Sequence, residues 1–317
     1  MSKGEFGLIQ RFFSQQQAQP SSIIQGIGDD CAVLHTQQLS DLVISTDTSI
    51  AGKHFPHDAD PVLIGKRCLE VAVSDLAAMG ATPLYFTLNI SLPPNPANWL
   101  VAFSKGLFAS ANRFPMTLIG GDTTKIDSLS QCQMSVTVFG SLQGRTGLYR
   151  RGANPNDFIY VSGTLGDGAL GLAAYQKPEN FTATDRDYLL DAYLSPKAQI
   201  QLGQALVGKA TSCIDISDGL LSDLGHILNA SSVGAEIHTD KVPLSTALKR
   251  NMNQDDAIHL ALTGGDDYQL CFTSPLSKAA LGIDNIYLIG NITQSKGLSF
   301  TPNNYVPPKT TGFDHFL

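Results

Sequence analysis

Alternating apolar and polar residues predict the clearest strands of this chain. Apolar residues alternate with polar ones over 84–92 and again over 134–142, as in strands with one buried face. Shorter apolar runs predict strands over 42–46 and 117–119, and both runs lead toward an aspartate. The first half of the chain therefore contains sheet-forming segments with carboxylates close to their ends.

Helices are predicted between these strands. Asp60 and Pro61 are typical of an N-cap followed by the first helical position, and Gly80 and Pro83 are typical of the end of a helix. A second helix is predicted over 99–112. This half thus mixes strands with long helices.

A stretch without apolar periodicity, residues 143–157, is the predicted domain boundary. Beyond it we predict strands over 158–162, 212–216, 258–262, 268–273 and 286–289, and helices over 168–176, 196–207 and 219–230. The mixture predicts an α/β (α+β) protein with two domains, residues 1–148 and 149–317.

Aspartate dominates the acidic residues. Of the 28 Asp and Glu residues only four are Glu, and the aspartates gather with Gly, Ser and Thr. These clusters are Gly28-Asp29-Asp30, Ser45-Thr46-Asp47-Thr48, Gly120-Gly121-Asp122-Thr123-Thr124, Asp215-Ile216-Ser217-Asp218-Gly219 and Gly264-Gly265-Asp266-Asp267. Short carboxylates at turns and strand ends suit rigid oxygen coordination of a hard cation such as Mg²⁺. The clusters predict several metal ions and a highly anionic ligand.

The bulk composition argues against several classes of function. A net charge of −7 is unlike the basic footprint of broad nucleic-acid binding. The five cysteines are widely spaced and form no CxxC pair, which argues against a zinc site or a disulfide framework. The sequence has no run of 18 apolar residues and no leader-like apolar segment at its start. We expect a reduced, cytoplasmic protein without nucleic-acid or membrane partners.

Asp75 is the most informative single residue. It shares a helix face with Cys68, Ala72 and Met79, and that face is apolar. A lone carboxylate there is costly unless it is paired or bound to metal, so we favour a functional role over a buried Asp that caps a loop or pairs with Arg.

Asp47 and Asp122 directly follow apolar runs. In α/β domains ligands bind at the carboxyl ends of strands. A turn aspartate that accepts local N–H groups would explain either one alone. Because the two occur together, we favour metal binding.

Two glycine patterns resemble nucleotide motifs only in part. Residues 166–171 spell GxGxxG, but the predicted strand ends at residue 162, so a dinucleotide site is poorly supported. Residues 203–209 resemble a P-loop, yet Ala210 follows Lys209 where Ser or Thr is needed. That segment is better explained as a helix end capped by Gly208. Direct phosphoryl transfer, in which cations offset the repulsion between two phosphates, fits the aspartate clusters better.

With these motifs, the sequence resembles the thiamine-monophosphate kinase family. This family belongs to the ATP-binding PurM-like superfamily, which includes aminoimidazole ribonucleotide synthetase. The resemblance covers the whole chain. It rests on GIGDDCAV (26–33), STDTSIAGKHF (45–55), EVAVSDLAAMGATP (70–83), IGGDTT (119–124), RRGANPND (150–157), SGTLGDGALGL (162–172), ATSCIDISDGL (210–220), LTGGDDYQLCFT (262–273) and GFDHF (312–316). It implies a two-domain PurM-like fold and ATP-dependent phosphorylation of thiamine monophosphate to thiamine diphosphate.

The resemblance also implies roles for individual residues. The Mg²⁺ ligands would be Asp30, Ser45, Thr46, Asp47, Asp75, Asp122, Asp215 and Asp218, of which Asp75, Asp122 and Asp218 would be catalytic. ATP would contact Gly121, Asp122, Arg150 and Ser217, and the thiamine substrate would contact His54, Asp266 and Phe313. The family is a homodimer built on the amino-terminal domains.

Two positions depart from the family pattern. The family usually has Glu in place of Asp266 and Trp in place of Phe313, both at the thiamine end of the substrate. Three alternatives stay open from the sequence: a superfamily synthetase acting on another phosphorylated metabolite, an NAD-binding oxidoreductase that uses residues 166–171, and a non-catalytic metal or nucleotide sensor.

Overall fold

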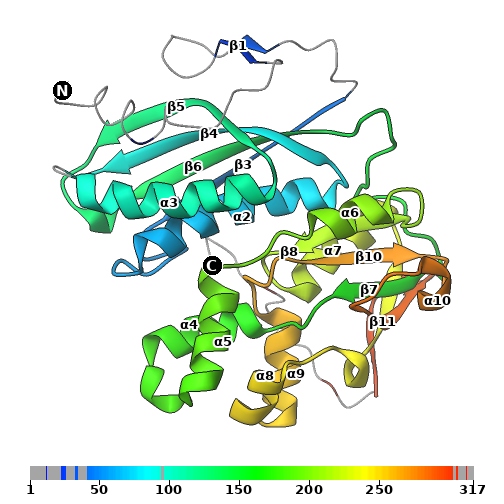
Figure 1. The fold of residues 1–317 in the computed structure, drawn as a ribbon. Helices are drawn as coiled ribbons and strands as arrows, with labels where there is room; N and C mark the ends of the chain where they lie inside the picture. Colours follow the sequence, from blue (N-terminus) through cyan, green and yellow to red (C-terminus); the bar gives the residue numbers. More distant parts are fainter. Residues whose placement is uncertain are drawn as a thin grey trace. The chain divides into compact units, whose positions relative to one another are not determined.

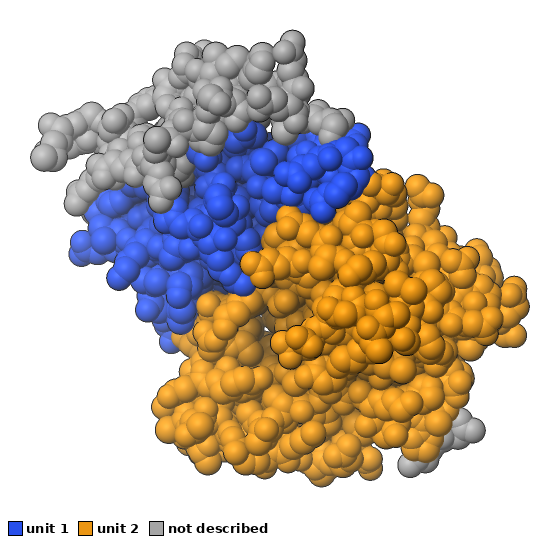
Figure 2. Space-filling view, turned by 45° about the vertical axis from the view of Figure 1, so that its right-hand side comes forward, with its two compact units in different colours: residues 1–76, 81–145 blue, residues 77–80, 146–317 orange. Residues whose placement is uncertain are grey.

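The chain divides into two compact units, residues 1–76 with 81–145 and residues 77–80 with 146–317 (Figure 2). The computed structural model describes residues 41–93 and 96–302, together with Phe12, 23–25, 33–34, Tyr305 and Gly312. Both units combine a sheet with helices, so the predicted α/β (α+β) class is confirmed. The predicted boundary at residues 148 and 149 stays a prediction.

The first unit is a four-stranded sheet with two helices on one face (Figure 1). The strand order is β3-β6-β4-β5, and only the β4–β5 pair is parallel. The elements are β3 (Leu42–Ile50), α2 (Pro61–Ala78), β4 (Thr82–Leu92), α3 (Ala97–Arg113), β5 (Thr117–Lys125) and β6 (Gln133–Ser141), and a separate two-stranded sheet pairs β1 (Ile23–Gln25) with β2 (Val33–Leu34). The predicted strands and helices of this half are present, and β3 and β5 are longer than predicted.

Glycines allow the two helices of this unit to pack closely. A Cβ added at Gly65 would lie 2.1 Å from the Phe103 carbonyl oxygen, and one at Gly106 would lie 1.8 Å from the Val62 carbonyl oxygen. Neither position has room for a side chain. The helices therefore form a compact layer that buries the alternate residues of the sheet, such as Val136.

The second unit has a six-stranded sheet in the order β12-β9-β11-β7-β10-β8. Only β12 and β9 pair in parallel. The strands are β7 (Phe158–Ser162), β8 (Ser212–Ile216), β9 (Gly234–His238), β10 (Gln269–Ser274), β11 (Ile286–Thr293) and β12 (Gly297–Thr301). The helices are α4 (Asp167–Gln176), α5 (Ala183–Leu194), α6 (Ile200–Leu206), α7 (Leu220–Ser231), α8 (Thr246–Asn251), α9 (Gln254–Thr263) and α10 (Lys278–Leu281).

The core of this unit lies between its sheet and α7. Leu220, Leu224 and Ile227 are fully buried and join one apolar cluster with Ile214 and Ile216 of β8. Full burial of a Leu or Ile side chain contributes about 1.5–3 kcal/mol. This packing fixes the start of α7 beside the end of β8, where the Asp215–Gly219 cluster lies.

One prediction in the second unit is wrong, one helix was missed, and one helix is shorter than predicted. Residues 258–262, predicted as a strand, lie within helix α9, because Asn253 caps that helix by accepting a hydrogen bond from the Asp256 N–H at 3.0 Å. Helix α5 was not predicted, although Thr182 caps it in the same way. The helix predicted over 196–207 is shorter and begins at Ile200. Among the described residues, the helices are too short or too polar to span a bilayer.

Candidate active site

The first group of site residues lies where β3 faces α2. Ser45 Oγ donates a hydrogen bond to Asp75 Oδ2. Side chains alternate along β3, so Ser45, Asp47 and the buried Ser49 point to the same face of the sheet. Asp75 is half-buried, in agreement with its place on an apolar helix face. The structure therefore brings Ser45, Asp47 and Asp75 to one face.

Thr46 and Asp122 lie on the opposite face of this sheet. Thr46 Oγ1 lies 2.9 Å from Thr137 Oγ1, and both threonines are neighbours in the register of β3 and β6. Asp122 pairs in register with Asn89 of β4, which is exposed, so both side chains lie on the same face of the sheet. Asp122 also accepts a hydrogen bond from Thr124 Oγ1 at 3.2 Å. Neither Asp47 nor Asp122 follows a strand end as predicted, since β3 and β5 continue past them.

Asp47 and Asp122 also lie on different edges of the described sheet. The order β3-β6-β4-β5 separates their strands by three inter-strand spacings, or about 14 Å at roughly 4.8 Å each. Oxygen ligands of one Mg²⁺ lie about 2.1 Å from the ion. One ion cannot bind both side chains within one chain.

Gly121, beside Asp122, occupies a position that only glycine fits. Its φ is +150°, and an added Cβ would lie 1.9 Å from the Leu88 carbonyl oxygen. A side chain at residue 121 would push β5 away from β4. The main chain before Asp122 is therefore bare and exposed on this strand, which suits close approach of a ligand.

His54 lies in the turn between β3 and α2. Its Nδ1 accepts the Ile50 N–H at 3.0 Å, and its carbonyl oxygen accepts a hydrogen bond from Arg67 Nε at 3.1 Å. In a neutral ring this arrangement places the proton on Nε2. The turn thus fixes both the position and the tautomer of His54.

The second group lies around the turn between β8 and α7. Asp215 is buried at the end of β8, next to Leu270 of β10. The main-chain N–H groups of Ser217, Asp218 and Gly219 all donate to Asp223 Oδ2, at 3.1, 3.1 and 3.2 Å. One buried carboxylate therefore holds the turn that contains Ser217 and Asp218.

Burial and, to a smaller extent, the neighbouring Asp218 raise the pKa of Asp223 to about 7, although the three N–H groups act to lower it. Asp223 was not predicted as a site residue. The argument applied to Asp75 would have found it, because Asp223 shares an apolar helix face with Leu220, Leu224 and Ile227.

Asp266 is tied to this same turn. Its N–H donates to the Ser217 carbonyl oxygen at 2.8 Å, and Asp266 Oδ1 accepts a hydrogen bond from the Tyr268 hydroxyl at 3.1 Å. The contact between Asp266 and Ser217 thus brings Asp266 to the turn that contains Ser217 and Asp218. Gly312 also lies against this turn, since a Cβ added there would be 2.6 Å from the Asp218 carbonyl oxygen. Asp30 and Phe313 lie outside the described residues.

Arg150 is exposed in the second unit. Its carbonyl oxygen accepts a long hydrogen bond from Ser231 Oγ at 3.5 Å, and the same hydroxyl accepts the N–H groups of Gly152 and Ala153. Its guanidinium group makes no hydrogen bond or ion pair with the part of the chain that the structure describes. Arg150 therefore has an anchored main chain and a side chain available for an anionic group.

The glycine loop before α4 is closed by an aspartate. Asp267 accepts the Gly166 N–H at 2.7 Å and the Gly168 N–H at 3.0 Å. Burial raises the pKa of Asp267 to about 8. In a dinucleotide site these N–H groups would face the pyrophosphate, and β7 would have parallel neighbours, whereas both its neighbours are antiparallel. These observations argue against the NAD-binding alternative.

The donors in the first unit suit a hard cation by their chemistry. Ser45, Asp47 and Asp75 offer only oxygen atoms. No group of three or more His, Cys, Asp or Glu side chains within the described ranges is placed to hold a metal ion. Mg²⁺ does not require such a group, because it commonly uses one or two carboxylates together with water and substrate phosphates. The residues present therefore fit Mg²⁺.

Family models match both halves of the chain. The N-terminal domain of AIR synthase related protein matches residues 28–142, and the C-terminal domain of the same family matches residues 154–301.

Individual relatives cover the full length. Thiamine-monophosphate kinase from Salmonella typhimurium is 43% identical over 100% of this chain and 99% of its own length. The crystal structure of thiamine-monophosphate kinase from Stenotrophomonas maltophilia has a TM-score of 0.83 at 39% identity and covers 90% of this chain and 93% of that one. AaThiL, solved in complex with AMPPCP and TMP, has a TM-score of 0.77 at 29% identity and covers 86% of each chain. The chain therefore belongs to the thiamine-monophosphate kinase family, within the AIR synthase related proteins.

Proposed function

We propose that this kinase phosphorylates thiamine monophosphate with ATP, giving thiamine diphosphate and ADP, at the oxygen-donor residues described above. The observation that supports this site most directly is the contact of Ser45 with Asp75, with Asp47 on the same face. Direct phosphoryl transfer needs positioning and charge neutralisation more than covalent chemistry. The relative AaThiL, solved with AMPPCP and TMP, contains a nucleotide analogue together with the acceptor.

Several Mg²⁺ ions are part of this proposal. Their ligands are Asp30, Ser45, Thr46, Asp47, Asp75, Asp122, Asp215 and Asp218, the positions given by the family resemblance. When bound, Mg²⁺ neutralises charge on phosphate oxygens. Because one ion cannot bind both Asp47 and Asp122 of one chain, their separation supports either separate ions or a site shared between two copies.

ATP contacts Gly121, Asp122, Arg150 and Ser217 in this proposal. The bare main chain at Gly121 and the exposed guanidinium group of Arg150 support these roles. Asp75, Asp122 and Asp218 are the proposed catalytic carboxylates.

The acceptor contacts His54, Asp266 and Phe313. His54 can donate from Nε2 to a phosphate oxygen, because its Nδ1 already accepts the Ile50 N–H. Asp266 offers a carboxylate, held by the Tyr268 hydroxyl, to a cationic ring.

A homodimer is also proposed, through the first unit. Leu42, Ile44 and Ile50 of β3 are 45%, 56% and 36% exposed, and they lie on the sheet face opposite Ser45 and Asp47. Exposed apolar side chains in a row favour an interface. Because β3 is an edge strand, we infer that a second copy packed there also supplies its Asp122, around that edge, to a site beside Asp47 of the first copy.

Mixed dimers test this arrangement. Asp47→Asn and Asp122→Asn should each be inactive alone, but unfolding and refolding the two variants together should restore about a quarter of the wild-type rate. Half of the random dimers are then mixed, and each mixed dimer has one intact site. No recovery in dimers shown to be mixed would contradict a shared site.

A cytoplasmic location is supported by the use of ATP and by the cysteines. Cys68, Cys132, Cys213 and Cys271 are buried and unpaired, as in proteins of reducing compartments.

The first experiment is a direct assay. Purified protein is incubated with ATP, Mg²⁺ and thiamine monophosphate, and thiamine diphosphate is followed by chromatography. We expect a product that depends on both the acceptor and Mg²⁺. ATP binding without product would contradict the proposed acceptor and would direct the search to other phosphorylated metabolites.

A further inference from the structure

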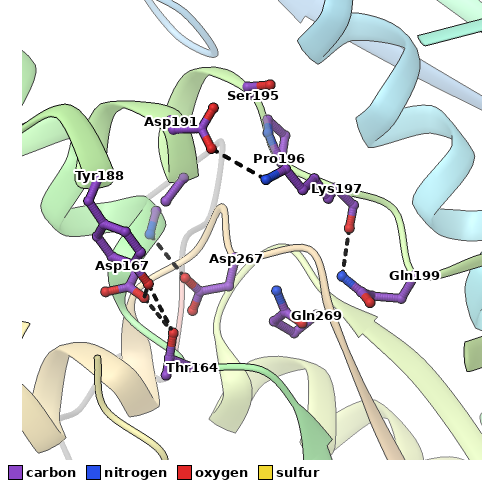
Figure 3. Close-up of a pocket in the computed structure, with 12 residues that line it drawn as sticks. Thr164, Asp167, Tyr188, Asp191, Ser195, Pro196, Lys197, Gln199, Asp267 and Gln269 are labelled. Atoms are coloured by element: carbon purple, nitrogen blue, oxygen red, sulfur yellow. Dashed lines mark hydrogen bonds and ion pairs between the residues drawn. The ribbon is translucent and has the colours of Figure 1, made fainter. Parts of the chain in front are cut away.

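Single oxygen-bearing side chains hold several loops of the second unit. Asp223 accepts three main-chain N–H groups of the turn before α7. Asp267 accepts the N–H groups of Gly166 and Gly168 in the glycine loop, beside a pocket of about 170 Å³ (Figure 3). In a third loop, residues 149–157, the corresponding group is the hydroxyl of Ser231. This third loop contains one of the residues that we assign to ATP.

The third loop has no regular secondary structure. Residues 149–157 lie outside helices and strands, so individual contacts decide where its two arginines lie. The Tyr149 carbonyl oxygen accepts the Cys213 N–H at 2.9 Å. Gly152 has a φ of +118°, and an added Cβ would lie 2.4 Å from the Thr211 carbonyl oxygen. The loop therefore runs directly along the start of β8.

The Ser231 hydroxyl contacts three main-chain groups of this loop. It accepts the N–H groups of Gly152 and Ala153, both at 3.1 Å, and it donates to the Arg150 carbonyl oxygen at 3.5 Å. A serine hydroxyl has one donor and two acceptor positions. Its whole hydrogen-bonding capacity is therefore used within residues 150–153.

Ser231 is itself held in a rigid position. It is the last residue of α7, and Ile227 and Leu228 of that helix belong to the buried core of the unit. Directly after it, Ser232 adopts a left-handed conformation, and its N–H donates to the carbonyl oxygens of Leu228 and Asn229. The hydroxyl that holds the loop thus belongs to a well-packed and capped helix end.

The two neighbouring arginines of the loop differ in their contacts. The Arg151 guanidinium lies over the ring of Tyr149, 4.9 Å from its centroid, in a cation–π contact. The Arg150 side chain is exposed, and its guanidinium makes no hydrogen bond or ion pair with any residue of the described ranges. The loop therefore retains Arg151 and leaves Arg150 for a ligand.

We propose that Ser231 is a positioning residue for nucleotide binding. This inference rests on the proposed function, in which Arg150 contacts ATP. The hydroxyl group holds the main chain of residues 150–153 so that the Arg150 guanidinium meets a phosphate group of ATP. An arginine with a fixed main chain loses less freedom on binding. Ser231 touches neither substrate and acts through Arg150.

The test compares KM values for ATP and for thiamine monophosphate. Ser231→Ala removes the partner of the Gly152 and Ala153 N–H groups, so the loop should loosen. We expect the KM for ATP to rise about fivefold. The kcat and the KM for thiamine monophosphate should stay unchanged, because a loss of uniform binding affects KM alone. Ser231→Thr keeps the hydroxyl and should keep the KM for ATP near the wild-type value.

A double variant shows whether Ser231 acts through Arg150. Arg150→Ala alone should raise the KM for ATP at least about tenfold, as expected for a hydrogen bond between charged groups. Adding Ser231→Ala to Arg150→Ala should cause no further rise, because the residue to be positioned is already absent. A further rise in the double variant would contradict the positioning role.

Two controls match these changes. Ser277→Ala also removes a hydroxyl that accepts a main-chain N–H, that of Ala280 at 3.3 Å, in the cap of α10 in the same unit. Arg151→Ala removes the neighbouring positive charge. Both variants should leave the KM for ATP unchanged.

The outcomes separate the role of Ser231 from the reaction. An unchanged KM for ATP in Ser231→Ala, or an equal rise in the KM for thiamine monophosphate, would overturn the role. An unchanged KM for ATP in Arg150→Ala would overturn it as well, since no contact would remain to be positioned. If Ser231→Ala does not fold, Ser231→Cys decides, because a thiol keeps the size but bonds weakly.

A wild type that makes no thiamine diphosphate would instead overturn the proposed function. The Kd for the ATP analogue AMPPCP, measured by calorimetry in the same variants, would then decide on Ser231. A rise of about fivefold in Ser231→Ala, absent in the Arg150→Ala background, would uphold the positioning role, and equal Kd values in the wild type and Ser231→Ala would overturn it.

Discussion

The two units position their polar residues by different physical means. In the first unit, Ser45, Asp47 and Asp75 lie within β3 and α2, so sheet and helix hydrogen bonds fix their main chains. In the second unit, Ser217, Asp218 and Asp266 lie on turns. There, a buried side chain, Asp223, replaces the regular main-chain bonds.

This difference predicts different consequences of substitution. Where secondary structure positions a ligand, removal of its charge should affect the chemistry and leave the fold intact. Where a buried carboxylate positions a turn, substitution of that carboxylate should affect both the chemistry and the fold, although it touches neither substrate nor metal. Substitutions in the first unit should therefore change activity without changing stability, whereas substitutions of the second kind should change both.

The largest effect is expected from Asp75→Asn. Asn keeps the size of Asp and can still accept the Ser45 hydrogen bond, but it loses a charge that we assign to Mg²⁺. We expect kcat to fall by at least about 10²-fold with little change in Tm. The measurements are steady-state kinetics and thermal unfolding.

The control for Asp75 is Asp127→Asn, which removes an exposed carboxylate of the same unit. It should leave both kcat and Tm unchanged. Near-normal activity of Asp75→Asn would mean that this carboxylate has no part in the reaction. It would also contradict the expectation that a substitution in the first unit changes activity without changing stability.

The next effect is expected from Asp223→Asn. Asn can still turn its amide oxygen toward the N–H groups of Ser217, Asp218 and Gly219, but a neutral amide accepts three hydrogen bonds more weakly than a carboxylate, so the turn should loosen. We expect the Mg²⁺ concentration for half-maximal rate to rise about tenfold, as for residues that orient metal ligands, and Tm to fall.

Asp185→Asn is the matched control for Asp223. Both aspartates are 2% exposed and lie in the second unit, but the Asp185 carboxylate binds Arg250 and Asn251 and no proposed site residue. Its substitution should lower Tm and leave the Mg²⁺ requirement unchanged. If Asp223→Asn and Asp185→Asn required the same Mg²⁺ concentration, Asp223 would have a structural role only.

A smaller effect concerns stability against pH at Asp267. Burial raises its pKa in the folded state from 3.8 to about 8. The folded protein therefore holds a proton that the unfolded chain releases, and the stability from this group is lost as pH rises from about 4 through about 8. Asp267→Asn should flatten the decline of Tm over that range. An unchanged slope would mean that another group causes the decline.

The sequence predicted the first unit better than the second for a physical reason. Alternation predicted β4 and β6, and the Asp60-Pro61 and Gly80 signals predicted α2, because each signal acts within its own element. The sheet face of Asp122 depends on its register against Asn89, which no local pattern contains. The sequence therefore predicted residue types at the site but not their distribution over two faces.

The second unit shows what local patterns miss. Residues 258–262 form an apolar run short enough for a strand, and only the cap at Asn253 identifies the helix. Asp267 looks like the other aspartates of its cluster, because its partners are the main-chain N–H groups of the distant residues Gly166 and Gly168. The apolar helix face singles out Asp223 in the sequence, but its contacts with the turn became visible only in the folded structure.

The smallest effect is expected from Phe313→Trp, which restores the residue usual in the family. Trp presents a stronger face to a cation than Phe does, and a whole cation–π contact at an exposed site contributes about 0.5–1 kcal/mol, which sets the upper limit of the gain. The KM for thiamine monophosphate should fall by up to about fivefold, with the KM for ATP unchanged as the internal control. Since Asp75→Asn is expected to alter kcat and Phe313→Trp only KM, the two changes probe metal and ring contacts separately. An unchanged or raised KM for thiamine monophosphate would count against stacking at residue 313, and the ring contacts would then have to come from Asp266.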